Sequence, residues 1–379
     1  MYGTKFQKMN QLLVCCLGLL MVACTSKKPR TETKTVLYEN TIHIDSSIII
    51  PSEYTAYRTA DNMVIDGQAV ENAWSKAAYT STFIDIEGVK EPKYKTQVKM
   101  LWDDAYLYVY AELEEPHIWG NIKKHDAVVF YNNDFEVFID PTDDTYNYVE
   151  IEVNALNTVW DLCLNKAYRF GGHANDYYEI EGLKTAVYLG GSLNDATDID
   201  TFWSVEMAIP FEVLLQRKRK TVKHPKGGDY WRINFSRVQW EHDLNDGMYS
   251  LKKENGKRLP EYNWVWSNQG AINMHLPEHW GYLVFSDHLV GKEATEVTIP
   301  QVLNKQVAYA LLEQIKFGKH KSLLDSSPQT MYQLNQLEIR QNLFDVVFLK
   351  TYVGFELYIE NLTSKEQFVI NEEGKFKLL

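Results

Sequence analysis

Two neighbouring stretches near the middle of the chain alternate between polar and apolar residues with the period of a β-strand. They run from Asn133 to Pro141 and from Tyr148 to Ala155, and both carry carboxylates on one side of the alternation. Because successive side chains of a strand point to opposite faces, each stretch has an aliphatic face and an acidic face. The pattern predicts two adjacent strands whose aliphatic faces pack on a core.

The acidic face of these strands predicts a ligand-binding surface. Its outward residues are expected to be Glu136 on the first strand and Tyr148, Glu150, Glu152 and Asn154 on the second. Hydroxyl groups of a sugar need hydrogen-bond acceptors, and its C–H face needs a flat apolar ring. Clustered carboxylates and an amide beside an aromatic ring therefore favour a polyhydroxylated ligand.

Other strand-like segments extend over most of the chain. From about Asn40 to Asp287, short alternating runs separated by turn residues are typical of an antiparallel β-sandwich. Thr96 to Trp102 and Tyr106 to Leu113 flank a tight turn and predict a hairpin. Phe202 to Ile209 and Trp231 to Trp240 predict two more strands. The fold class is therefore expected to be mainly β.

The last part of the chain has a different character. Residues 300–317 carry apolar side chains close to helical spacing, which predicts an amphipathic helix. Residues 352–359 and 367–378 predict a terminal hairpin or meander. We expect a β-sandwich over residues 40–287, followed by a small α+β segment over residues 288–379.

The first residues predict where the protein works. Lys5 and Lys8 precede a short apolar run that ends just before Cys24. The run is too short to span a bilayer as a stable helix, so we interpret residues 1–23 as a lipoprotein signal peptide and Cys24 as the lipidated residue. Residues 24–39 are expected to form a polar tether. The predicted location is the cell envelope, on an outer membrane facing the periplasm or the surface. A short uncleaved anchor, the alternative, also holds the chain to a membrane.

Composition limits the partners. The formal net charge of -12 argues against nucleic acid or anionic lipid as the main partner. The 10 Trp and 24 Tyr residues suit stacking on carbohydrate, although large sandwiches also use aromatic rings to fill their cores. Only Cys163 would remain besides the lipidated cysteine, and its apolar surroundings predict a buried packing residue. No zinc motif, phosphate loop or dinucleotide fingerprint occurs in the sequence, so no organic cofactor is expected.

Four motifs resemble those of family 9 carbohydrate-binding modules and occur in the same order. They are Ile65 to Trp74 with its Ile-Asp-Gly opening, Trp102 to Val109, Asp134 to Asp140, and Trp266-Ser267 followed by Trp280-Gly281. The resemblance covers about residues 61–287. It is nearest to lipoproteins of Bacteroidetes-type bacteria that carry one such module with an added C-terminal segment.

The resemblance implies a β-sandwich that binds glucans or xylans, as the modules attached to xylanases do, by clamping a sugar between two tryptophans. Here the first clamp position falls near Phe130 or Tyr131 and the second near Met274, and Glu152 takes the place of a sugar-contacting arginine. Together, the strand pattern and the resemblance predict the ligand-binding residues Phe130, Tyr131, Glu136, Glu150, Glu152, Asn154, Arg232 and Trp266.

The resemblance also implies structural calcium. The turn after the first acidic strand offers Asp140, Asp143 and Asp144, which are hard oxygen ligands at short spacing. A solvated acidic turn is the alternative, and the resemblance favours calcium.

Two other functions are open to this sequence. Glu136, Glu150, Glu152 and Asp161 could supply the two carboxylates of a glycoside hydrolase, with an endo-xylanase as the expected type. Nothing in the sequence singles out an acid with a raised pKa, so no catalytic residue is predicted. Met274 and His275 suggest haem ligation, but adjacent residues on a strand point to opposite faces and cannot both bind one iron. The expected function is a lipid-anchored carbohydrate-binding protein that captures polysaccharide for catabolism by enzymes encoded elsewhere.

Overall fold

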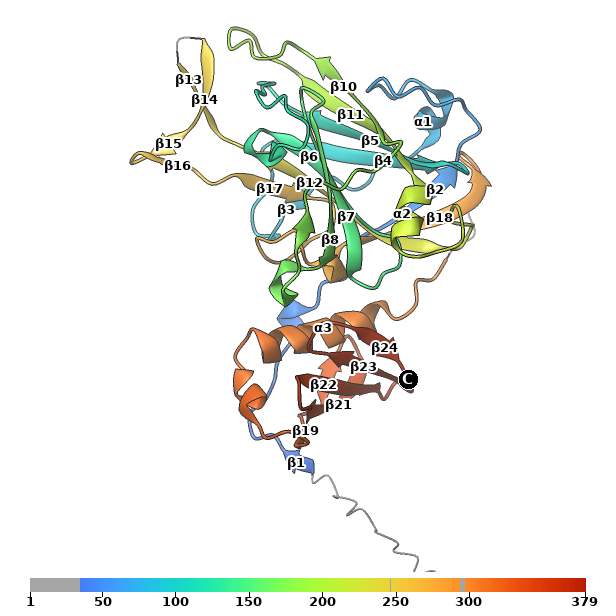
Figure 1. The fold of residues 1–379 in the computed structure, drawn as a ribbon, viewed down its shortest axis with the longest axis vertical. Helices are drawn as coiled ribbons and strands as arrows, with labels where there is room; N and C mark the ends of the chain where they lie inside the picture. The colour runs from blue at the N-terminus through green and yellow to red at the C-terminus, as the bar shows by residue number, and fades with distance from the viewer. Residues whose placement is uncertain (1–34, 246, 294–296) are drawn as a thin grey trace, which may run out of the picture.

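A computed structural model describes residues 35–245, 247–293 and 297–379. They form a large β-domain and a smaller α+β domain below it in Figure 1. The predicted mainly β class, a β-sandwich with a C-terminal α+β segment, is confirmed. Among the described residues, no helix has the length and apolar character needed to cross a membrane.

The large domain is built on one 13-stranded sheet. In spatial order its strands are β10 (Lys184–Gly190), β11 (Phe202–Pro210), β5 (Tyr106–Glu114), β4 (Thr96–Trp102), β2 (Glu53–Arg58), β18 (Gly281–Leu289), β12 (Tyr230–Gln239), β6 (Asp134–Asp140), β7 (Tyr146–Asn154), β8 (Val159–Lys166) and β9 (Ala174–Asn175), with β17 (Tyr262–Val265) beside β12 and β3 (Ile84–Asp85) beside β17. Neighbouring strands are antiparallel except β2, which runs parallel to both β18 and β4.

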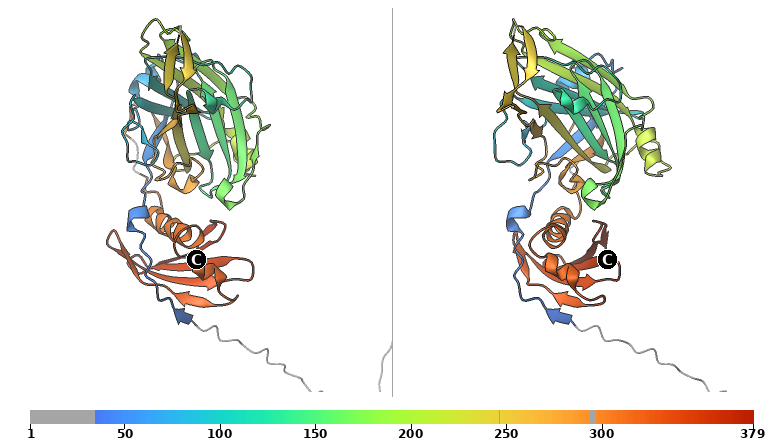
Figure 2. Two further views of the ribbon diagram at one scale, coloured as in Figure 1. Left: turned by 90° about the vertical axis from the view of Figure 1, so that its left-hand side faces the viewer. Right: turned by 60° about the vertical axis from the view of Figure 1, so that its left-hand side comes forward.

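The sheet folds over so that its two ends face each other as the layers of a sandwich (Figure 2). Apolar side chains from β4, β5 and β11 meet those from β6, β7 and β12 in one core. Val149, Ile151 and Val153 lie in this core, as the alternation predicts. Fully burying an aliphatic side chain stabilises a fold by about 1.5–3 kcal/mol, so the alternation fixes which face of β7 points inward.

Short elements connect and extend these strands. They are α1 (Asn72–Lys76), α2 (Phe211–Arg217) and the hairpins β13 (His242–Asn245) with β14 (Met248–Leu251) and β15 (Lys253–Glu254) with β16 (Lys257–Arg258). The two hairpins project from one end of the sandwich (Figure 1).

The small domain packs one helix on a seven-stranded sheet. The helix is α3 (Val302–Lys316), and the sheet contains β1 (Thr35–Leu37), β19 (Met331–Gln333), β21 (Asn342–Lys350), β22 (Phe355–Asn361), β23 (Glu366–Asn371) and β24 (Phe376–Leu378), with β20 (Leu337–Ile339) beside β21. The predicted helix and terminal meander are confirmed. Helix α3 lies between its own sheet and the sandwich (Figures 1 and 2).

The boundary between the domains differs from the predicted one at residue 40. Strand β1 pairs in parallel with β19, although residues 24–39 were expected to form a tether. Ile42 and Ile44 then enter the core of the small domain. The sandwich begins only with β2 at Glu53. Pairing between the two ends of the chain leaves no local signal, so the sequence pattern cannot reveal it.

Replacing Ile44 with alanine is expected to destabilise the small domain by about 2–5 kcal/mol, because a fully buried side chain would leave a cavity. The matched control is Ile50→Ala, since Ile50 is 39% exposed. Urea unfolding combined with limited proteolysis measures both variants, and fragments from residues 300–379 should be released first in Ile44→Ala. Equal behaviour of the two variants would contradict the assignment of residue 44 to the small domain.

Candidate functional site

Strand register places the predicted acids side by side. Glu136 on β6 pairs with Glu152 on β7, and Glu152 pairs with Trp160 on β8. Two residues along, Phe138 pairs with Glu150. Side chains of directly paired residues share a face of the sheet, and this face is the outer one because the alternate residues fill the core. Acids and aromatic rings therefore form adjoining rows on the outer face.

These rows form the floor of a cleft of about 330 Å³, which we call the acid-and-aromatic cleft. Its lining includes the acids Glu136, Glu150, Glu152 and Glu261 and the rings of Phe130, Trp160, Tyr168 and His275. The volume lies at the lower end of the usual range for small-molecule sites. Carboxylate oxygens accept hydrogen bonds and the rings offer apolar faces, which is the combination that a sugar ring requires.

Other segments of the chain cover much of the outer face of β6 and β7, which carries the acids. The carboxylate of Glu152 is only 2% exposed, and Tyr148 and Asn154 are fully buried. Residues far along the chain lie over this face, among them Met274 and Trp280, which pack against Tyr148. The prediction that these side chains point away from the core is right, and most of them are nevertheless buried beneath other segments of the chain.

Burial raises the pKa of each acid in the floor of the cleft. The pKa of Glu136 rises to about 7, chiefly through desolvation and further through the charge of Glu261. Burial also holds the pKa of Glu150 and Glu152 well above the ordinary value, and neighbouring carboxylates add to the effect. Desolvation lowers the pKa of His275 to about 4, so this imidazole is neutral at pH 7 and does not offset the acids.

Two further residues that line the cleft, His275 and Trp160, carry ring nitrogens that can form hydrogen bonds. His275 Nδ1 lies 3.1 Å from the hydroxyl of Tyr148, and its Nε2 lies 3.9 Å from Glu150. Trp160 Nε1 is buried and has no hydrogen-bond partner among the described residues.

Four of the predicted ligand-binding residues line the cleft. They are Phe130, Glu136, Glu150 and Glu152. Tyr131 is 46% exposed and lies next to Phe130, with the guanidinium of Arg258 over its ring at 5.4 Å. It is not part of the lining itself.

Asn154 and Trp266 do not reach the cleft. The Asn154 amide donates to the carbonyl of Ile122 at 2.9 Å and accepts the N–H of Thr158 at 3.0 Å, so it holds the turn between β7 and β8. Trp266 is buried in the sandwich core, where its ring lies over Gly281. A Cβ on Gly281 would lie 2.3 Å from that ring. The assignment of both residues to ligand contact is corrected: they have structural roles.

Arg232 is also structural. Its guanidinium is fully buried, donates to Asp143 at 2.6 Å and to the carbonyl of Trp280 at 2.8 Å, and lies 3.9 Å from the centre of the Tyr282 ring. The assignment of Arg232 to ligand contact is corrected, because every one of these partners belongs to the protein.

The carboxylates predicted to bind calcium are paired with cations of the chain. Lys218 Nζ lies 2.7 Å from Asp140 and 2.7 Å from Asp144. Asp143 pairs with Arg232 and with Lys305 on α3, and these cations hold its pKa below the ordinary value despite burial. Because their charges are already neutralised, these three acids do not fit a calcium ion. Asp140 and Asp144 pair within the sandwich, and Asp143 joins the sandwich to the small domain through Lys305.

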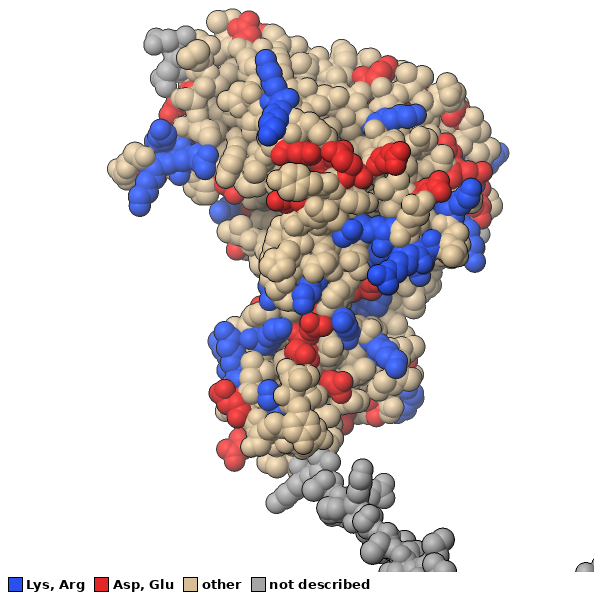
Figure 3. All heavy atoms as spheres, in the orientation of Figure 1, with Lys and Arg blue, Asp and Glu red and all other residues tan. Residues whose placement is uncertain are grey.

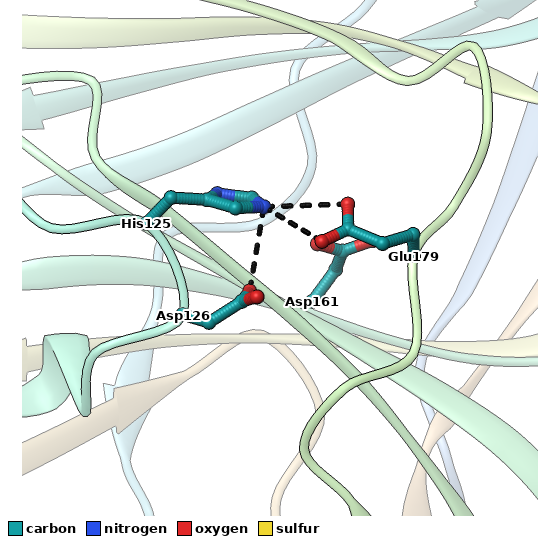
Figure 4. Close-up of side chains that lie close together, drawn as sticks. All are labelled: His125, Asp126, Asp161 and Glu179. Atoms are coloured by element: carbon teal, nitrogen blue, oxygen red, sulfur yellow. Dashed lines mark hydrogen bonds and ion pairs between the residues drawn. The ribbon is translucent and has the colours of Figure 1, made fainter.

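A second group of potential ligands lies beside a larger hollow of about 500 Å³. Figure 4 shows His125 pointing toward Asp126, Asp161 and Glu179. His125 Nε2 lies 3.0 Å from Glu179, and Asp161 accepts the N–H of Ile180 at 2.5 Å. Burial raises the pKa of Asp161 to about 6. The lining of this hollow contains no Phe, Tyr or Trp ring, so it offers no stacking platform for a sugar.

Several residues of the cleft were missed by the sequence reasoning. Trp160, Tyr168, Glu261 and His275 were not predicted as ligand contacts. Trp160 alone had a local signal, since it lies at an alternate position of a strand that follows an acidic strand. Tyr168 lies in a short 3-10 helix just after β8, and Glu261 and His275 lie in loops whose return to this face depends on tertiary folding.

Charge is unevenly spread over the surface. Figure 3 shows acidic side chains in a band across the upper domain, while Lys and Arg gather nearer to the junction of the two domains. A neutral or cationic ligand suits the acidic band better than an anionic one.

A β-sandwich with an acid-and-aromatic cleft on its outer face defines a ligand-binding module. The family model described as carbohydrate family 9 binding domain-like matches residues 65–235. Residues 65–235 are therefore similar to family 9 carbohydrate-binding domains, and the predicted resemblance is confirmed.

Known proteins are similar over parts of the chain. Exoglucanase XynX of Acetivibrio thermocellus is 26% identical over 225 residues, which are 59% of this chain and 17% of that protein. Endo-1,4-beta-xylanase A of Thermoanaerobacterium saccharolyticum is 29% identical over 150 residues, which are 40% of this chain and 12% of that protein. The chain thus spans less than a fifth of either relative's length.

A solved structure has a related arrangement. It is a carbohydrate binding module family 9 from Caldicellulosiruptor kristjanssonii in complex with cellotriose. Its TM-score is 0.40 at 16% sequence identity, with 65% of this chain and 100% of that chain covered.

Proposed function

We propose that the protein binds an oligosaccharide or a chain end of a polysaccharide in the acid-and-aromatic cleft. The observation that carries this proposal is the row of paired residues Glu136, Glu152 and Trp160, which sets two acceptors beside an indole ring. The carboxylates accept hydrogen bonds from sugar hydroxyls, and the indole covers a C–H face. The two relatives named as an exoglucanase and a xylanase support a β-linked glucan or xylan as the ligand class.

The proposal includes an anchored location. Cys24 and the segment before it lie outside the described residues, so the lipid anchor rests on the sequence pattern. An envelope lipoprotein that captures polysaccharide would work together with separate glycan-degrading enzymes. Paired carboxylates in a cleft are also what glycoside hydrolysis requires, so the binding experiment should include an assay for new reducing ends.

Trp160→Ala is expected to weaken sugar binding by about 10–100-fold, because it removes the ring that adjoins the acceptor row. The measurement is calorimetric titration of the full-length chain with cello- and xylo-oligosaccharides. Tyr177→Ala is the matched control, since Tyr177 is 89% exposed and does not line the cleft. Equal affinities of both variants would contradict binding at this cleft, and release of reducing ends by the wild type would favour the hydrolase.

A further inference from the structure

A further hollow, of about 480 Å³, lies where the sandwich meets the small domain, and we call it the junction pocket. Its walls come from three parts of the chain: the loops at the lower end of the sandwich, the segment that leads from β1 to β2, and helix α3. Figure 1 shows α3 directly below the lower end of β8. The volume lies within the range of about 300–1,000 Å³ that is usual for small-molecule sites.

The junction pocket adjoins the acid-and-aromatic cleft along two short segments. Asn273 lines both hollows. On the same loop, His275 lines the cleft and Leu276 lines the pocket. Just after β8, Tyr168 lines the cleft and its neighbour Arg169 lines the pocket. A ligand that extends from the cleft past Asn273 therefore enters the junction pocket.

The junction pocket carries both a donor and an acceptor of hydrogen bonds. His279 Nδ1 lies 2.8 Å from the carbonyl oxygen of Gln269, so Nδ1 carries the proton and Nε2 is the acceptor. Burial lowers the pKa of His279, which keeps the ring neutral at pH 7. Asn273 Oδ1 accepts the N–H of His275 at 2.9 Å, which leaves its amide NH₂ as a donor. Among the described residues, neither His279 Nε2 nor Asn273 Nδ2 has a hydrogen-bond partner.

The rest of the lining suits a neutral ligand with an apolar face. Phe317, at the end of α3, is partly exposed and offers a ring, and Leu276 adds aliphatic surface. Arg169 donates to Glu313 at 2.7 Å and also pairs with the buried Glu278. Because two carboxylates neutralise this guanidinium, it does not favour an anion. Hydroxyl groups that donate and accept, next to a C–H face, match this lining.

We propose that the junction pocket is a second sugar subsite, through which the small domain takes part in binding oligosaccharides that are longer than the cleft alone can hold. This inference rests on the proposed function, because the ligand extends from the cleft. The pocket is held in shape across the two domains, since Gln306 on α3 donates to the carbonyl of Glu278 at 2.7 Å and Glu313 pairs with Arg169. A preformed subsite adds affinity at a small cost in ordering.

The test is calorimetric titration of the full-length chain with cello- and xylo-oligosaccharides of increasing length, from disaccharide to hexasaccharide. The wild type should bind the hexasaccharide about 10-fold more tightly than the disaccharide, and Phe317→Ala should remove most of this gain while keeping the disaccharide affinity. Ser47→Trp should have the same effect, because it places a large side chain at a partly exposed residue that lines the junction pocket and not the cleft. This second variant removes no packed side chain.

Phe376→Ala is the matched control, since Phe376 is a partly exposed ring of the same domain that lines neither hollow, and it should keep the dependence on length. A wild type that binds short and long oligosaccharides equally well would overturn the subsite and leave the proposed function standing. A folded wild type that binds none of them would overturn the proposed function, and the subsite with it. Equal losses for disaccharide and hexasaccharide in Phe317→Ala and Ser47→Trp would also contradict the subsite, because both changes would then act on the cleft.

Discussion

Arg232→Met is expected to lower the free energy of unfolding of the sandwich by about 3–5 kcal/mol, the usual effect of breaking a buried ion pair by removing one partner. The guanidinium is fully buried; its Nε donates to Asp143 and its Nη1 donates to the carbonyls of Glu278 and Trp280. Methionine fills part of the same volume but supplies neither charge nor donors. Asp143 would keep only Lys305 as a cationic partner.

Urea unfolding followed by tryptophan fluorescence measures this change. Arg219→Met is the matched control, because Arg219 lies exposed just beyond α2 and its loss should change stability by less than about 0.5 kcal/mol. Sugar affinity of the Arg232→Met protein, measured below its unfolding transition, should equal that of the wild type, since Arg232 does not line the cleft. A stable variant that has lost sugar affinity would restore Arg232 as a ligand contact.

The alternation of polar and apolar residues along each strand made most strands of the sandwich, and their buried faces, predictable. Val149, Ile151 and Val153 face the core because only one face of a strand can be buried against the other layer. Register was not predictable in the same way. The pairing of Glu152 with Trp160 depends on the turn between β7 and β8, which the Asn154 amide holds, and a shift by one residue would have turned Trp160 into the core.

The roles of single residues were harder to predict than the faces on which they lie. Arginine suits a sugar contact and a buried ion pair equally well, and the choice depends on Asp143, 89 residues away. Lys305, which completes that pair, is 162 residues from Asp143 and belongs to the other domain. No pattern local to any of these residues encodes their meeting, so the sequence could not show that Asp143, predicted as a calcium ligand, belongs to a domain junction.

The buried carboxylates of the acid-and-aromatic cleft should make the stability of the sandwich depend on pH. The folded-state pKa of Glu136 is about 7, against an ordinary value of 4.5. The folded state therefore binds more protons than the unfolded state between these values, and stability falls as pH rises through about 7. The pKa of Asp134, Glu150 and Glu152 is raised in the same direction, and Glu261 adds repulsion to Glu136.

Histidine titration would oppose this trend only at lower pH. Burial lowers the pKa of His275 from 6.5 to about 4, so its contribution to stability is lost as pH falls below about 6.5. The range from pH 6.5 to 8.5 therefore excludes the titration of His275, while Glu206, whose pKa burial raises to about 7, titrates there in the same direction as Glu136. Over that range, we expect the melting temperature to fall by roughly 2–4 °C, because about 1 kcal/mol of the Glu136 contribution is still to be lost above pH 6.5.

Glu136→Gln should flatten this dependence, because glutamine fills the same volume and does not ionise. Glu338→Gln, at an exposed position of β20, should retain the wild-type slope. A melting temperature that rises between pH 6.5 and 8.5 would mean that these acids are already ionised and balanced in the folded protein. The raised pKa of Glu136 would then be contradicted.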